Sequence, residues 1–376
     1  MTCYRLSSRL VSPFMVQRSR QTFTPQTVDY LTGSTLRGAL AGLYLRTGGR
    51  AEDPGFQTLF GPHGPNFPDL LPVSDAGSEA QVLPLTAASC KRFPGFLADQ
   101  GHGVRDSLAV TALNRETGQG VPEFWKCPVC GHTCVPFPGY HSPDTGHKEQ
   151  PTVVLQRHTG IDRATGTVAQ SIFYASQVIR EEDQSGSPQY FTGRMYADQE
   201  QYQALQELLA RGPLFAGADR VRGLGEMELS VQECEPVDVD AEAWSRPWRS
   251  YYTKTTGQEL APGTYFSLTL TSPAVLVDRF LRPSAKLNLD FPDLTLVGKV
   301  AKMTTVQGWQ AAWGLPKPDD MALAAGSVFL FRYQGQDVSG LSAYLTQVAR
   351  DGLGLRRQEG LGAVSICDPV HHKEGI

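Results

Sequence analysis

Three cysteines of this chain fall within eight residues, in the stretch Lys126-Cys-Pro-Val-Cys-Gly-His-Thr-Cys134. A Cys-x-x-Cys pair followed by glycine lets the backbone turn so that both thiolates point at one ion, and a structural zinc ion needs four ligands. The spacing therefore predicts a structural zinc site, with free thiols as the alternative. The expected ligands are Cys90, Cys127, Cys130 and Cys134. Three histidines of the same region compete for the fourth position: His132, His141 and His147.

Two Gly-Leu-Gly triplets occur in the same context, each after an amphipathic helical pattern and before a short apolar run. They are Gly223-Leu224-Gly225, preceded by Arg222, and Gly360-Leu361-Gly362, preceded by Arg356 and Arg357. Glycine lets backbone N–H groups approach an anion, and arginine offers a planar fork for phosphate. Taken singly, each triplet is better explained as a tight turn beside solvated arginines. Their repetition favours a tandem duplication with paired RNA-binding loops.

A third candidate lies at the start of an expected helix, where Gly33 and Ser34 are followed one turn later by Arg37. Free N–H groups and the positive end of the helix dipole attract anions at such a position. From this motif alone, a plain capped helix is the better explanation.

The polar run from Arg157 to Gly166 is the fourth candidate. It is either a hairpin loop with ordinary turn chemistry or a nucleic-acid contact through Arg157, His158 and Arg163. His158 is also the histidine that we consider as a general base in an RNA-cleaving alternative. The sequence nominates no clear second acid or base for it.

The overall charge gives no support to nucleic-acid binding, because 34 Lys and Arg against 38 Asp and Glu leave a net charge of −4. Any RNA contact must therefore come from local basic loops. The composition is that of an ordinary globular protein, without the roughly 18 consecutive apolar residues of a membrane span or the pattern of a signal peptide. Seven cysteines are too few for a disulfide scaffold in 376 residues.

The elements that must position these residues follow from periodicity and caps. Leu36, Leu40 and Leu43, for example, form one stripe of a helix. We expect strands over 2–16, 170–179, 190–197 and 226–231, then 265–277, 300–309, 326–333 and 363–367, with helices over 32–46, 198–211 and 339–350. In this order, 170–179 pairs with 190–197. The pattern predicts an α+β fold of two tandem ferredoxin-like (RRM-like) modules. They span residues 1–233 and 234–376, and a Gly/Pro-rich, zinc-stapled insertion occupies about 48–150 of the first.

Several of these segments resemble the RAMP superfamily of CRISPR-associated proteins. Tyr30-Leu-Thr-Gly-Ser-Thr-Leu-Arg-Gly-Ala-Leu40 resembles its Pro-Gly-Ser-Ser-Leu-Arg-Gly-Ala-Leu element, with Thr32 where proline is usual. The segment 158–167, followed by Ile172-Phe-Tyr174, resembles its R-x-x-I-D-R-x-T-G motif. Residues 354–362 resemble its C-terminal Gly-rich loop, and 325–331 the strand before that loop's helix in handle-binding members. Ser89-Cys-Lys91 with the later Cys-x-x-Cys is similar to the two-module member of type III-D complexes.

The resemblance covers nearly the whole chain and implies a non-catalytic, RNA-binding subunit of a type III CRISPR effector complex, acting in antiviral defence in the prokaryotic cytoplasm. Such a subunit holds the 5′ repeat-derived handle of the CRISPR RNA and meets target RNA only indirectly. It docks against the large polymerase-like subunit and the RAMP backbone subunits, with no membrane partner. The alternative is a RAMP endoribonuclease, either a target-RNA-cleaving backbone subunit or a guide-RNA-processing enzyme. A metal-stapled protein without an RNA role is the third possibility.

Overall fold

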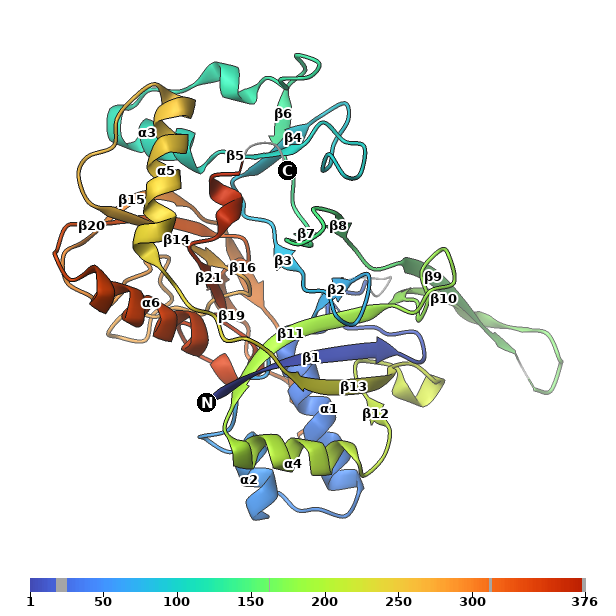
Figure 1. Ribbon diagram of the computed structural model, residues 1–376. Helices are drawn as coiled ribbons and strands as arrows, with labels where there is room; N and C mark the ends of the chain where they lie inside the picture. Colours follow the sequence, from blue (N-terminus) through green and yellow to red (C-terminus); the bar gives the residue numbers. More distant parts are fainter. Residues whose placement is uncertain (18–25, 162, 311–312, 374–376) are drawn as a thin grey trace. The chain divides into compact units, whose positions relative to one another are not determined.

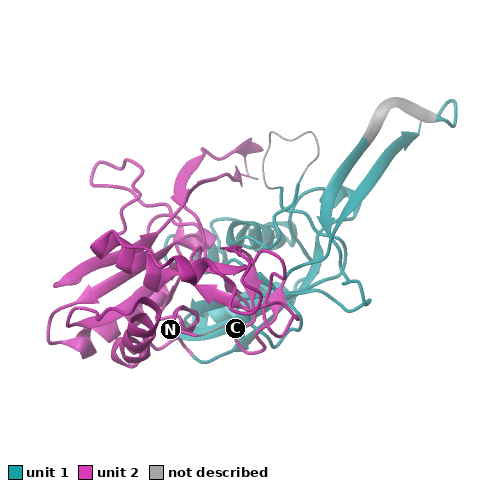
Figure 2. Cartoon of the chain, turned by 90° about the horizontal axis from the view of Figure 1, so that it is seen from above, with its two compact units in different colours: residues 1–79, 150–235 teal, residues 80–149, 236–376 magenta. Residues whose placement is uncertain are grey.

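The computed structural model describes residues 1–17, 26–161, 163–310 and 313–373. The chain divides into two compact units, each built from two separate stretches (Figure 2). Unit 1 comprises residues 1–79 and 150–235, and unit 2 comprises 80–149 and 236–376. The last crossing lies near the expected boundary at 233, but residues 80–149 pack with the second half of the chain rather than with the first. Among the described residues, no helix is both long and apolar enough to cross a membrane.

Unit 1 contains a five-stranded antiparallel sheet in the order β12-β13-β1-β11-β2. Its strands are β1 Thr2–Leu10, β2 Leu71–Val73, β11 Tyr190–Ala197, β12 Leu214–Phe215 and β13 Glu226–Glu233. Three helices lie together on one side of this sheet (Figure 1). They are α1 Gly33–Arg46, α2 Pro54–Phe60 and α4 Gln199–Leu209.

The predicted helices of unit 1 form where their caps and apolar stripes place them. Leu36, Leu40 and Leu43 are fully buried in the core between α1 and the sheet. The Thr32 side chain caps α1 by accepting from the Thr35 N–H. Asp198 caps α4 in a reciprocal capping box with Gln201.

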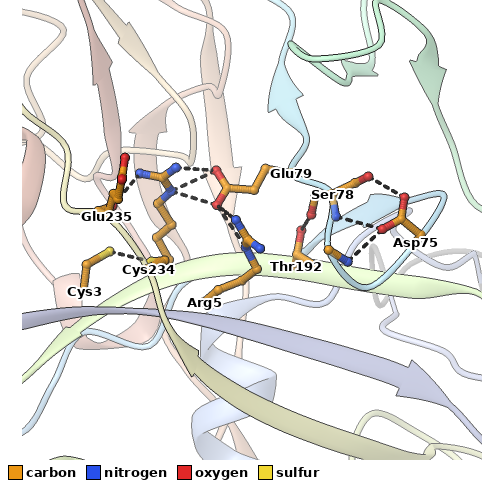
Figure 3. A network of polar contacts seen from close by, with 10 residues as sticks. Cys3, Arg5, Asp75, Ser78, Glu79, Thr192, Cys234 and Glu235 are labelled. Atoms are coloured by element: carbon orange, nitrogen blue, oxygen red, sulfur yellow. Dashed lines mark hydrogen bonds and ion pairs between the residues drawn. The ribbon is translucent and has the colours of Figure 1, made fainter.

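On the other face of this sheet, two arginines share one carboxylate (Figure 3). Arg5 on β1 and Arg194 on β11 are direct cross-strand partners. Both bind Glu79, with Arg5 Nη2–Oε1 at 3.0 Å and Arg194 Nη2–Oε2 at 2.7 Å. Both guanidinium groups are engaged by Glu79, whose single negative charge offsets one of their two positive charges.

A two-stranded antiparallel ribbon extends from unit 1, formed by β9 Val153–Ile161 and β10 Val168–Ile179 (Figure 1). The expected pairing of 170–179 with 190–197 is therefore wrong, since β10 pairs with β9 while β11 joins β1 and β2. The short connection between β9 and β10 makes this local pairing inexpensive in chain entropy. The sequence did not indicate the pairing of β9 with β10, because β9 contains polar residues and a ribbon outside the core lacks the apolar alternation that marks a strand.

Unit 2 contains a four-stranded antiparallel sheet in the order β15-β20-β14-β21. Its strands are β14 Thr264–Leu270, β15 Leu294–Val300, β20 Val328–Tyr333 and β21 Val364–Ile366. The expected strand 265–277 thus ends early, and 300–309 is divided among three short strands. Its helices are α3 Leu108–Thr117, α5 Ala241–Thr256 and α6 Val338–Asp351.

Both faces of the unit 2 sheet are covered, which explains why residues 80–149 belong to this unit. Leu341 and Leu345 of α6 pack against one face together with Phe266 and Phe331. The aromatic side of α5 and the apolar side of α3 cover the other face. That second core consists of Leu108, Ala109, Ala112, Leu113, Trp244, Trp248, Tyr251, Tyr252, Leu260, Tyr265, Val328 and Leu330. Residues 80–149 therefore supply a helix that the second half of the chain lacks.

The remaining elements of unit 2 are short. The stretch 80–149 adds two three-stranded sheets, ordered β5-β4-β6 and β3-β7-β8. Their strands are β3 Gln81–Val82, β4 Ala87–Cys90, β5 Val104–Asp106, β6 Cys134–Pro136, β7 Tyr140–His141 and β8 Lys148–Glu149. Between β15 and β20 lie β16 Met303–Val306, β17 Trp309–Gln310, β18 Leu315–Pro316 and β19 Asp320–Leu323. The 3-10 turns of unit 2 are η1 Pro122–Trp125, η3 Arg357–Glu359 and η4 Pro369–His371, and η2 Arg220–Arg222 belongs to unit 1.

Candidate nucleic-acid interface and metal site

The two Gly-rich loops, α4–β13 in unit 1 and α6–β21 in unit 2, have the same backbone conformation. Each contains a one-turn 3-10 helix, η2 or η3, flanked on both sides by residues with left-handed backbone angles. Gly225 N donates to Pro13 O and Gly362 N donates to Pro273 O, both at 2.8 Å. The similarity of the two loops therefore extends from their Gly-Leu-Gly triplets to their hydrogen bonds.

Glycine is required at equivalent positions for the same reason in each loop. Gly217 and Gly354 have φ of 83° and 78°. A Cβ added to either would collide with a backbone carbonyl, that of Met15 or Val275 respectively. These glycines are needed for the close approach of two chain segments, whether or not a ligand binds.

The arginines do not occupy matching slots in the way that the sequence suggested. Aligning the two turns on their flanking glycines pairs Arg220 with Arg357, Arg222 with Glu359 and Asp219 with Arg356. Arg220 and Arg357 are both exposed, and Arg357 Nη1 donates to the Asp351 carbonyl at 3.3 Å. The two loops thus have an exposed arginine at one equivalent position, and Arg222 is a further exposed arginine of the unit 1 loop.

Arg356 has a structural environment. Its Nη1 lies 2.6 Å from Asp320 Oδ2 and its Nη2 2.8 Å from Glu359 Oε2. Lys317 Nζ reaches the same Glu359 oxygen at 2.7 Å. The Arg356 side chain is only 19% exposed. Its charge is already paired, so Arg356 is a poor candidate for a phosphate ligand.

In unit 1, the Gly-rich loop meets the β9–β10 ribbon through a stack of three side chains. The Arg222 guanidinium lies 5.1 Å from the centre of the Tyr174 ring. That ring stacks on His158, with centroids 4.8 Å apart and planes 18° from parallel. Two predicted RNA contacts from distant parts of the sequence, Arg222 and His158, are thereby brought together. Tyr174 was not predicted, although it is the cross-strand partner of His158.

The other predicted residues of this ribbon are exposed. Arg157 is next to His158 in β9, so their side chains are on opposite faces of the ribbon, and Arg157 is exposed. Arg163 lies in the turn after β9. Cations near an aromatic stack offer both parts of a single-strand binding surface, since phosphates need charge and unpaired bases need a flat face.

The N-terminus of α1 is occupied by groups of unit 1 itself. Gly33 N donates to Asp69 Oδ1 at 2.7 Å, and desolvation raises the pKa of Asp69 to about 7. The Ser34 hydroxyl lies 3.2 Å from that of Thr32, and Arg37 Nη2 donates to the Phe60 carbonyl at 2.6 Å. These contacts favour the plain capped helix over an anion site.

Four potential metal ligands converge in unit 2: Cys90, His102, Cys127 and Cys130. Their ligand atoms all lie within 4.8 Å of one another. Cys90 Sγ is 3.5 Å from Cys130 Sγ, and Cys127 Sγ is 3.4 Å from His102 Nδ1. Three of the four expected ligands are present, and His102 takes the place expected for Cys134. This cluster could hold a metal ion.

Cys134 packs against the cluster but is not one of its four converging ligands. It opens β6 directly opposite Cys90 of β4, and this ladder holds its backbone beside the cluster. Its thiol is buried, and burial is the first cause that raises the pKa of Cys134. His102 was missed because no spacing rule links it to the Cys-x-x-Cys pair. The three competing histidines, His132, His141 and His147, also lie outside the cluster.

The surroundings of the Cys90 side chain favour its thiolate form. Burial raises its pKa, but the backbone N–H groups of Phe93 and Arg92 donate to it, and the net effect lowers the pKa of Cys90 to about 6. A thiolate at neutral pH is the form that binds a metal ion.

Comparisons with known proteins give weak similarities only. No protein-family model and no curated protein matches the chain. One solved chain comes from type III-B Cmr-beta bound to cognate target RNA and AMPPnP, with 13% identity and a TM-score of 0.40 over 91% of this chain and 93% of that one. A second, from the same complex bound to cognate target RNA, has 11% identity and a TM-score of 0.42 over 92% and 95%. The crystal structure of Cmr4 aligns at 12% identity and a TM-score of 0.24, over 62% of this chain and 100% of that one. TM-scores below 0.5 leave the functional assignment to the residues themselves.

Proposed function

We propose that this chain is a non-catalytic RNA-binding subunit of a type III CRISPR effector complex, and that it holds the 5′ repeat-derived handle of the CRISPR RNA. The duplicated Gly-rich loop is the observation that carries this proposal. Both copies have the same turn, glycines at the same positions and an exposed arginine at one equivalent position. The motif resemblance at 30–40, 158–167 and 354–362 gives the duplication its RAMP interpretation.

The strand orders support two tandem ferredoxin-like modules. In unit 1, α1 follows β1, α4 follows β11, and the order β13-β1-β11-β2 is that of a split β-α-β-β-α-β unit. Unit 2 has the equivalent order β21-β14-β20-β15, with α6 after β20. Residues 271–293, which are all described, contain no helix between β14 and β15, so α6 covers its face of the sheet without that helix, and α3 and α5 cover the opposite face.

RNA binding would be local, because the net charge of the chain is negative. Arg220 and Arg357 supply charge-assisted contacts to phosphates beside the open backbone of their loops. The stack of Arg222, Tyr174 and His158 supplies a flat surface for an unpaired base. Sequence-specific reading of single-stranded RNA commonly uses such splayed bases.

The metal cluster has the donor set of a structural zinc site. In a tetrahedron with Zn–S bonds of about 2.3 Å, neighbouring sulfurs lie roughly 3.8 Å apart. The separation of 3.5 Å between Cys90 and Cys130 is within a few tenths of this value. Three thiols and one imidazole would fill all four positions, so zinc would tie β4, the loop of His102 and the cysteine knuckle together without a catalytic role.

The partners follow from the same proposal: the large polymerase-like subunit and the RAMP backbone subunits, in the prokaryotic cytoplasm. The decisive experiment incubates the full-length chain with handle-containing RNA and with target RNA, then measures both filter binding and RNA length. Binding of handle RNA with unchanged length is expected. Cleavage lost in His158→Ala would replace the proposal with the endoribonuclease alternative. Absence of RNA binding at low salt would reject both.

A further inference from the structure

Each unit carries an antiparallel ribbon at the same point of its chain. In unit 1, β9–β10 lies between β2 and β11, which are the second and third strands of the split β-α-β-β-α-β order. In unit 2, β16 and β19 pair between β15 and β20, which hold the same two places. The shorter β17–β18 pair continues this second ribbon outward. The duplication therefore includes the ribbons.

The bases of the two ribbons are anchored by equivalent contacts. Phe14 and Ile179 exchange two backbone hydrogen bonds of 2.8 Å, and Ala274 and Leu323 exchange two of 2.9 Å. Each ribbon also packs one face on its Gly-rich loop in a small apolar cluster. The clusters are Met15, Val178 and Leu224 in unit 1, and Val275, Ala322 and Leu361 in unit 2.

An arginine of each Gly-rich loop then fixes the ribbon. Arg222 packs over Tyr174 in unit 1, and Arg356 pairs with Asp320 in unit 2. Among the described residues of the second ribbon, no pair of rings corresponds to the His158–Tyr174 stack. Its aromatic side chains lie further out.

The exposed surface of the second ribbon is aromatic and apolar. Trp309 is 57% exposed and Trp313 76%. Met303 and Met321 are also exposed, and they alternate along their strands with the partly buried Val306 and the buried Ala322. Tryptophan has the largest aromatic face of any side chain, and leaving it in water has no benefit for the stability of the chain.

We propose that the described part of this second ribbon, residues 303–310 and 313–323, is a second single-stranded RNA site, in which Trp309 and Trp313 stack on unpaired bases. The inference rests on the proposed function and extends it to a surface with no basic motif. RNA is favoured over a protein partner because the ribbon that occupies the equivalent place in unit 1 carries the arginine–tyrosine–histidine stack. The contact would be made to bases alone, since Lys317 and Arg356 at the ribbon's base already pair with acidic residues.

A contact of this kind has a distinct signature. Aromatic stacking does not release counterions, so its contribution is the same at every salt concentration, whereas phosphate contacts weaken as salt rises. It also requires bases, so an abasic strand with the same phosphates would not engage the tryptophans.

Intrinsic tryptophan fluorescence of the full-length chain tests this directly. Trp244 and Trp248 are buried, and Trp125→Phe removes the remaining partly exposed indole, which leaves Trp309 and Trp313 as the reporters. We expect quenching by a uridine oligonucleotide of about 12 nucleotides and none by an abasic strand of equal length. Equal quenching by both strands would overturn base stacking.

Variants then measure the contribution to affinity. Trp309→Ala and Trp313→Ala should each weaken binding roughly tenfold, with parallel plots of affinity against salt. Trp313→Phe should retain most of the affinity, and Phe280→Ala, which removes a 61% exposed aromatic ring elsewhere in unit 2, should change nothing. Trp313→Leu should bind as weakly as Trp313→Ala.

The outcomes separate this inference from the function on which it rests. If wild type binds RNA while both alanine variants bind equally well without a change in fluorescence, the ribbon is not an RNA site and the proposed function stands. Full RNA affinity in Trp313→Leu would show that an aromatic ring is not needed at this position and overturn the inference. A wild-type chain that binds no RNA would remove both.

Discussion

Replacing Arg220 and Arg357 by alanine removes the one exposed arginine that the two Gly-rich loops have in common. On single-stranded RNA, each phosphate that a cation neutralises adds about 0.7 to the salt dependence of log K, so the slope of the double variant should be smaller by about 1.4. A hydrogen bond to a charged group contributes about 1.5 kcal/mol, which corresponds to roughly tenfold in affinity per arginine at low salt. The fold should be unaffected, because the glycines that shape both turns remain.

Arg356→Ala should lower the stability of the fold and leave the salt dependence of RNA binding unchanged. Breaking a fully buried ion pair costs about 3–5 kcal/mol, but Arg356 is about a fifth exposed and Lys317 remains beside Glu359. We therefore expect a loss of about 2 kcal/mol in the free energy of unfolding, with the salt slope of RNA binding unchanged.

Filter binding of handle-containing RNA across a salt series, with denaturant unfolding of each variant, distinguishes the two classes of arginine. Arg246→Ala is a matched control, because it removes a 77% exposed arginine from α5 of unit 2. A wild-type slope in the double variant, or a reduced slope in Arg356→Ala with unchanged stability, would refute the assignment of roles.

Three further predictions concern the metal, pH and the loop glycines. Elemental analysis should find about one zinc per chain, absent from His102→Ala and retained in Cys134→Ser; the reverse pattern would restore the sequence-based ligand set. The pKa of Asp69 is raised to about 7 in the folded state, so between about pH 4 and 7 the folded chain binds one proton more than the unfolded chain. The free energy of unfolding should therefore fall as pH rises through this range. Urea unfolding curves should show this trend in the wild type and not in Asp69→Asn. Gly354→Ala should lower the free energy of unfolding by about 2–3 kcal/mol, because the new Cβ would collide with a backbone carbonyl and the residue has a positive φ. Gly257→Ala, which also has a positive φ but open space around the new Cβ, should lower it by about 1 kcal/mol. Equal losses in thermal melts would refute the close-approach argument.

Helices with both a cap and an apolar stripe were predictable from sequence. The stripes of α1, α4 and α6 are short-range patterns that packing did not override. α5 was missed although Trp244, Trp248, Tyr251 and Tyr252 follow a helical period, because Pro247 stands inside it. Proline is tolerated there within a helix anchored by aromatic packing on the sheet.

The features that were not predictable depend on contacts between distant residues. Nothing near His102 indicates that its ring reaches Cys127, since the loop between β4 and β5 brings it there. The neutralisation of Arg356 requires Asp320 from a ribbon that precedes the loop by a whole helix and strand. Local pattern indicated the glycines and the basic residues, and the fold decided which charges stay exposed.

The assignment of residues 80–149 to unit 2 bears on how the protein can be made and divided. The chain crosses between the two units three times, so neither unit corresponds to a contiguous stretch of sequence. During synthesis, α3 is made well before α5 and the strands of the unit 2 sheet, which follow it by about 130 or more residues. Until these elements have been made, the apolar side of α3 has no partner to pack against. A fragment ending at 235 would leave this side of α3 uncovered, and one beginning at 236 would expose a face of its sheet, so both halves should aggregate when expressed separately. Co-expressing them as two chains should restore solubility, since the missing surface would then be supplied in trans.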